Sequence, residues 1–115
     1  MSFRDGELFL NDISESINAI FEYLIDVEFN EFKSNRMMYQ AVIREFEIIG
    51  EAVKNIYPCL KEAYPKYPFR RIIDFRNRIS HEYFGINFKT IWDIIFYELP
   101  KLKKIINNIK KEKIC

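Results

Sequence analysis

The chain of 115 residues has little of three residue types that often carry chemistry, with one histidine, two cysteines and three glycines. His81, Cys59 and Cys115 are too few to form a zinc-type ligand cluster. The glycines are scattered, so the sequence contains no glycine-rich phosphate loop. We therefore expect no metal site and no cofactor. We expect both cysteines to be free thiols, because they form no motif.

Long apolar runs are also missing. No run approaches the about eighteen residues that a membrane-spanning helix needs, and the first seven residues lack the basic and then apolar layout of a secretory signal. The composition is nevertheless 49% hydrophobic and 17% aromatic, which is enough apolar material for one core and argues against disorder. We expect a single helical domain over residues 1–115, located in the cytoplasm and without membrane contact.

The formal net charge of +1 hides a separation of the two signs along the chain. Residues 1 to 33 hold eight acids against two bases, whereas residues 34 to 115 hold nine acids against sixteen bases. The positive charge gathers in two clusters: first Lys66, Arg70, Arg71, Arg76 and Arg78, and then Lys101, Lys103, Lys104, Lys110, Lys111 and Lys113. For the second cluster we favour a solvated helix end that complements the helix dipole. For the first, a solvated face and a phosphate-binding surface both stay open.

Apolar residues recur at alternating spacings of three and four, which is typical of helices that bury one face. The first such stretch predicts a helix over residues 5 to 27. The second predicts a long helix that ends before Pro58 and contains Gly50. An interior glycine costs helix stability, and the close approach of another helix would explain it, although a simply tolerated glycine is the alternative.

The second half of the chain predicts two more long helices. Between the second and the third long helix, three prolines leave room for at most a short turn of helix over residues 60 to 64. Pro68 suits the first turn of the third helix. Asn87 is a good N-cap for the fourth, which Pro100 should kink or interrupt. The sequence therefore predicts an all-α protein, an up-and-down four-helix bundle with a short extra helix.

Residues 76 to 83, Arg-Asn-Arg-Ile-Ser-His-Glu-Tyr, are the strongest candidate for chemistry. They place the only histidine, which can move protons near neutral pH, five residues after an arginine, whose planar fork binds phosphate. In helical proteins such residues are more often surface or boundary residues without a catalytic duty. The spacing alone therefore leaves both interpretations open.

Helix geometry limits how these residues can converge. At about 100° per residue, Arg76, Ser80 and Tyr83 fall on nearly one line of a helix, whereas His81 is displaced by about 140° from Arg76. Metal-free RNA cleavage by the 2′-hydroxyl needs a base, an acid and a cation, and one histidine per chain is one proton-transfer group too few. Convergence requires either that the helix ends near Ser80 or that a second copy contributes its motif across a dimer axis.

At these residues the chain resembles the HEPN-domain family, specifically the HepT-like toxins of HepT/MntA toxin–antitoxin pairs. Residues 76–83 match the Arg-x4-His-x-Tyr signature of that family. The resemblance extends over nearly the whole chain, through residues 47–54 (Glu-Ile-Ile-Gly-Glu-Ala-Val-Lys), Tyr64-Pro65, Pro68-Phe69, Tyr83-Phe84-Gly85, Ile91-Trp92 and Leu99-Pro100.

The resemblance implies an all-α homodimer, paired through the motif-bearing helices, that acts as a metal-independent endoribonuclease on RNA. By position, Arg76 would orient and neutralise the scissile phosphate, His81 would be the acid–base group, and Asn77 would support both. Tyr83 matches the tyrosine to which a nucleotidyltransferase antitoxin of the MntA kind adds AMP. The added bulk and negative charge would oppose RNA binding.

A second interpretation stays open. HEPN-like bundles also resemble the helical substrate-binding domains that accompany nucleotidyltransferases, so the chain could be a non-catalytic subunit that binds a nucleotide or a partner enzyme. Assembly beyond the dimer, for example with the antitoxin, is also left open by the sequence.

Overall fold

The computed structural model describes residues 3–81 and 87–115, and in these ranges the chain is helical and contains no strand. The helices are α1 (Phe3–Tyr23), α2 (Phe29–Ser34), α3 (Arg36–Asn55), α4 (Tyr57–Ala63), α5 (Phe69–His81), α6 (Phe88–Asp93), the π-helical turn η1 (Ile94–Glu98) and α7 (Leu99–Glu112). None of the helices in these ranges has both the length and the apolar content to cross a membrane.

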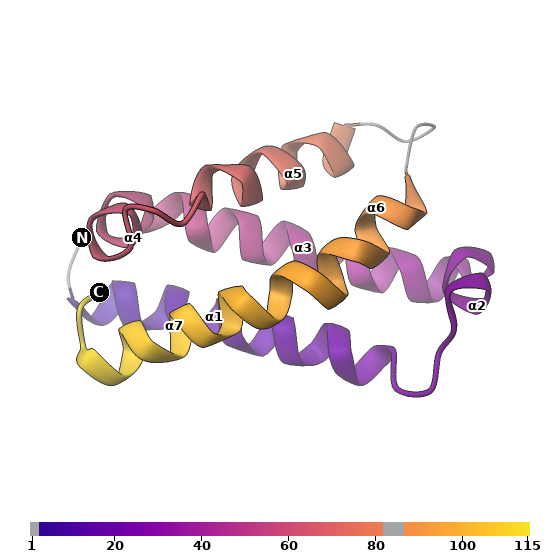
Figure 1. Cartoon of the computed structure of the whole chain (residues 1–115), viewed down its shortest axis with the longest axis horizontal. Coiled ribbons are helices and arrows are strands. Elements are labelled where there is room, and N and C mark those ends of the chain that lie inside the picture. Colours follow the sequence, from indigo (N-terminus) through magenta and orange to yellow (C-terminus); the bar gives the residue numbers. More distant parts are fainter. Residues whose placement is uncertain (1–2, 82–86) are drawn as a thin grey trace.

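The long helices alternate in direction, so the predicted all-α up-and-down bundle is confirmed (Figure 1). α3 packs against α1 and α5, and α7 packs along α1. The predicted short extra helix is α4, which is longer than expected because Pro58 starts it, as proline does well in a first turn.

The core is built from the apolar stripes that the spacing indicated. The stripe of Leu10, Ile13, Ile17 and Ile20 on α1, continued by Leu24 directly after the helix, is buried throughout. The helix itself ends at Tyr23 instead of residue 27, because Asp26 adopts a left-handed backbone conformation with φ of 59° that turns the chain toward α2. Burial of one face and a tight turn thus set the bounds of the helix.

The helix α2 was not predicted. Its Phe32 is fully buried and contacts the rings of Phe88 and Trp92, with ring centroids 6.2 and 5.3 Å apart. Asn35 then caps α3, since its side chain accepts a hydrogen bond of 3.1 Å from the backbone N–H of Met38. Phe29 of α2 also contacts the ring of Trp92, with centroids 5.7 Å apart, so two aromatic residues anchor this short helix to α6.

The fourth predicted helix is interrupted near Pro100, as expected. Asn87 caps α6 by accepting a hydrogen bond of 3.0 Å from the N–H of Thr90. The turn η1 then precedes α7, with the N–H of Leu99 bonded to the carbonyl of Ile94 five residues earlier. Proline has no N–H and its ring collides with the carbonyl four residues before it, so the widened turn accommodates Pro100 in the first turn of α7.

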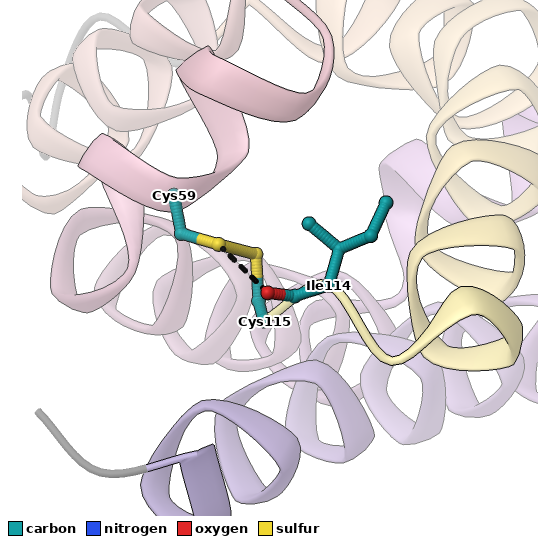
Figure 2. Close-up of a disulfide and its surroundings, with 3 residues drawn as sticks. All are labelled: Cys59, Ile114 and Cys115. Carbon is teal, nitrogen blue, oxygen red and sulfur yellow. Dashed lines mark hydrogen bonds between the residues drawn. A yellow bond between two sulfur atoms is a disulfide. The ribbon is translucent and has the colours of Figure 1, made fainter.

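The expectation of free thiols was wrong. Cys59 on α4 and Cys115 form a disulfide with Cα atoms 6.0 Å apart, across a sequence separation of 56 residues (Figure 2). α7 ends at Glu112. The next residue, Lys113, has a left-handed φ of 54° that turns the tail back, and this brings Cys115 to α4. Nothing in the sequence spacing indicates the pairing, because it depends on where two helices end.

The tail also packs closely on α1. A Cβ atom at Gly6 would overlap with the carbonyl oxygen of Cys115, so only glycine allows the tail to lie here. The disulfide and this contact together fasten one end of the bundle.

Candidate functional site

Arg76 lies on the face of α5 that packs against α3. A Cβ atom at Gly50 would overlap with Cβ and Cγ of Arg76, so the missing side chain of Gly50 makes room for the arginine. The predicted close approach of another helix at Gly50 is thereby confirmed. The Arg76 side chain is 25% exposed, which means that its stem is covered while its charged end still reaches solvent.

The guanidinium of Arg76 has two side-chain partners. Its Nη2 donates to Oε2 of Glu51 in an ion pair, and its Nη1 donates to Oδ1 of Asn77 at 2.6 Å. A guanidinium has five N–H donors, and apart from the two in these bonds, three have no hydrogen-bond partner within the described residues. The candidate phosphate-binding group is therefore oriented by Glu51 and Asn77.

Arg76 stands at the wall of an open hollow of about 500 Å³, here called the Arg76 hollow. It lies between α1, α3 and α5 and is lined by Phe9, Asp12, Arg44, Glu47, Ile48, Glu51, Ala52, Arg76 and Ser80. Ser80 lies one helical turn after Arg76 and lines the same hollow, so the prediction that these two residues share one face of the helix is confirmed. The lining carries three acids and two bases, which makes the hollow mixed in charge instead of strongly basic.

Asn77, the predicted supporting residue, contacts Arg76, whereas the contacts of His81 and Tyr83 lie outside the described residues. His81 is the last residue of α5, and its side chain lies outside the described residues, as does all of Tyr83. The convergence of His81 with Arg76 therefore stays a prediction. Sequence reasoning missed Glu51, although it follows Gly50 directly; an acid next to a glycine where two helices touch is the signal that could have found it.

The first basic cluster is mostly exposed on α5. Arg70 is paired with Asp74 at 3.6 Å, one turn along the helix, in a surface ion pair of the kind that adds little stability. Arg71 and Arg78 are exposed. The outer face of α5 therefore carries positive charge.

A second, smaller hollow of about 250 Å³ lies on the other side of α5, between α3, η1 and α7. Its lining is mostly apolar, with Tyr67, Arg71 and Glu98 as the polar residues. Burial, followed by the charge of Glu98 and a hydrogen bond to it, raises the pKa of Tyr67 to about 12. The hollow is an apolar pocket in which this phenol stays protonated.

Tyr67 should make stability fall at alkaline pH. Between an ordinary pKa of 10 and about 12 the folded protein keeps a proton that the unfolded chain has released, so unfolding becomes more favourable as pH rises through this window. Tyr67→Phe has no such proton, and its melting temperature should therefore fall less than that of the wild type between pH 9 and 12. Thermal melts of both proteins measure this difference. Parallel curves would contradict the assignment, since lysine deprotonation affects both proteins equally.

Known proteins resemble this chain over most of its length. Residues 13–109 match the family model described as "Ribonuclease HepT-like". The chain is 43% identical over 104 residues to "Putative RNase MJ1380" of Methanocaldococcus jannaschii, which covers 90% of this chain and 95% of that protein. It is 35% identical over 108 residues to "Probable ribonuclease HepT" of Thermococcus cleftensis, covering 94% and 98%. No solved structure matched the chain at a significant level.

Proposed function

The chain belongs to the HepT-like ribonuclease family, and on that premise we propose that it is a metal-independent endoribonuclease, the toxin of a toxin–antitoxin pair. One observation carries the proposal: Arg76 is held by Glu51 and Asn77 at the wall of a hollow, five residues before the only histidine, and three of its N–H donors have no partner within the part of the chain that the structure describes. A fixed guanidinium with free donors is suited to the charge of a scissile phosphate. The proposed substrate is RNA, and the proposed location of the protein is the cytoplasm.

The residues divide the reaction as follows. The 2′-hydroxyl attacks the adjacent phosphorus, the bond to the 5′-oxygen breaks, and a 2′,3′-cyclic phosphate and a free 5′-hydroxyl result. Arg76 neutralises the charge of the phosphorane, Asn77 keeps Arg76 in place, and His81 transfers protons. Because each chain has one histidine, a homodimer supplies the second proton-transfer group from the partner copy.

The proposal is tested with purified protein and end-labelled RNA in the presence of EDTA. We expect cleavage that continues without metal and leaves 2′,3′-cyclic phosphate ends. Light scattering on the same sample should report a dimer at concentrations where cleavage occurs. Inactive wild-type protein would contradict the proposed ribonuclease activity. A monomer with full activity would contradict the active site shared by two copies.

The proposed control of the toxin acts at Tyr83, which lies outside the described residues. Co-expression with the cognate nucleotidyltransferase should add one AMP to Tyr83 and suppress cleavage, because the adenylyl group adds bulk and negative charge beside the RNA site. Intact-mass and peptide mass spectrometry measure this. Modification at another residue, or in a Tyr83→Phe variant, would remove Tyr83 from the proposal.

One observation favours the alternative of a non-catalytic partner- or nucleotide-binding subunit. Asp12, Glu47 and Glu51 line the Arg76 hollow and oppose the phosphates of RNA. A folded, dimeric protein that binds its nucleotidyltransferase but leaves RNA intact in the same cleavage test would establish this alternative.

A further inference from the structure

Glu51 is the centre of a chain of side-chain contacts across α3 and α5. Its Oε2 accepts from Nη2 of Arg76, and its Oε1 accepts from Nδ2 of Asn55 at 3.5 Å. Asn55 lies one turn further along α3, and its Nδ2 also donates to the backbone carbonyl of Glu51 at 2.8 Å. On the other side of the guanidinium, Asn77 accepts from Nη1. Glu51 is thus tied to its own helix and to the arginine opposite.

Arg76 is held at both ends of its side chain as a result. Gly50 provides the space in which its Cβ and Cγ lie, and the next residue on α3 holds the far end. A free arginine samples many rotamers, and ordering them on binding would reduce the binding free energy. Here the folded chain has already ordered the side chain before any phosphate arrives.

We propose that Glu51 is a positioning residue for the cleavage reaction, setting the orientation in which the remaining N–H groups of Arg76 meet the scissile phosphate. This inference rests on the proposed ribonuclease function. Glu51 acts through Arg76, because its Oε2 accepts from Nη2 of the guanidinium.

Substitution of a positioning residue should change kcat, whereas substitution of an acid that only repels RNA phosphates should change KM. Glu51→Ala frees the guanidinium, so kcat should fall about 10- to 100-fold, in the range expected when a group is displaced by about 1 Å. Glu51→Gln keeps an oxygen acceptor and should retain more of kcat than the alanine variant.

Glu47→Gln is the matched control. It removes the same charge from the same hollow, and Glu47 makes no contact with Arg76 within the described residues. This variant should lower KM for RNA while kcat stays close to the wild-type value.

The coupling is isolated by a double-mutant cycle. In an Arg76→Ala background, Glu51→Ala should have no further effect on kcat, because its only route to the reaction has been removed. Independent, multiplying effects of the two changes would overturn the proposal, and so would a Glu51→Ala variant that keeps its kcat as Glu47→Gln does.

A measurement without RNA separates this inference from the proposed function. In nuclear magnetic resonance spectra of the side-chain N–H groups, Arg76 should give slowly exchanging signals, unlike exposed Arg36, and Glu51→Ala should abolish the difference. If wild-type protein cleaves RNA and Glu51→Ala keeps its kcat, positioning by Glu51 is overturned and the ribonuclease function stands. If wild-type protein is inert, the proposed function fails, and the Arg76 signals still decide whether Glu51 fixes the arginine.

Discussion

His81→Ala is expected to lower the rate of RNA cleavage by about 10²- to 10⁴-fold, the usual contribution of a general acid or base. The single histidine per chain leaves no second imidazole that could substitute within the same polypeptide. In a dimer, the variant loses the proton-transfer groups of both copies. The initial rate of cleavage in EDTA, measured at saturating RNA, reports the loss in kcat.

Arg76→Ala is the companion variant and should cause a loss of similar size, since it removes the cation that faces the phosphorane. Arg36→Ala is its matched control, because Arg36 is an exposed arginine at the start of α3, away from the hollow. Circular dichroism melts confirm that each variant is folded. Retention of most of the wild-type kcat in either His81→Ala or Arg76→Ala would remove that residue from the reaction.

Breaking the disulfide is expected to cost about 2–4 kcal/mol in the free energy of unfolding. A cross-link that closes a loop of 56 residues restricts the unfolded chain, and the loop-closure estimate for this length is about 4 kcal/mol. For a domain of this size, the melting temperature should therefore fall by about 10 °C or more in a Cys59→Ser, Cys115→Ser double variant.

A reducing agent gives the matched control for this prediction. Reduction should lower the melting temperature of the wild type to about that of the double variant, and it should leave the double variant unchanged. An unchanged wild-type melt in reducing buffer, together with free-thiol titration that shows complete reduction, would contradict a stabilising role. The result also matters for the proposed cytoplasmic location, since reducing compartments oppose most disulfides.

The parts of the fold that local rules decide were predictable. The buried stripe of α1, the cap at Asn87 and the interruption before Pro100 each depend on residues within one or two turns. The close approach at Gly50 was predictable in kind, because an interior glycine requires an explanation. Its partner, Arg76, was identified separately from its spacing to His81.

What could not be predicted depends on distant segments meeting. The disulfide requires one end of α4 to lie beside the chain that follows α7. The helix α2 is stabilised because Phe32 packs against the aromatic rings of α6. Glu51 was overlooked for the same reason, since only the packing of α5 on α3 shows that its carboxylate meets a guanidinium. The sequence identified the arginine, and the packing of the helices identified the residue that holds it.

The π-helical turn has a consequence for how chains of this kind can vary in length. Such a turn holds one residue more than an α-helical turn would at the same place, so it can lose one residue while the helices on either side keep their buried faces inward. A deletion within α7 would instead rotate everything after it by about 100°. Because Pro100 requires the wider turn, the extra residue and the proline should disappear together in shorter members of the family.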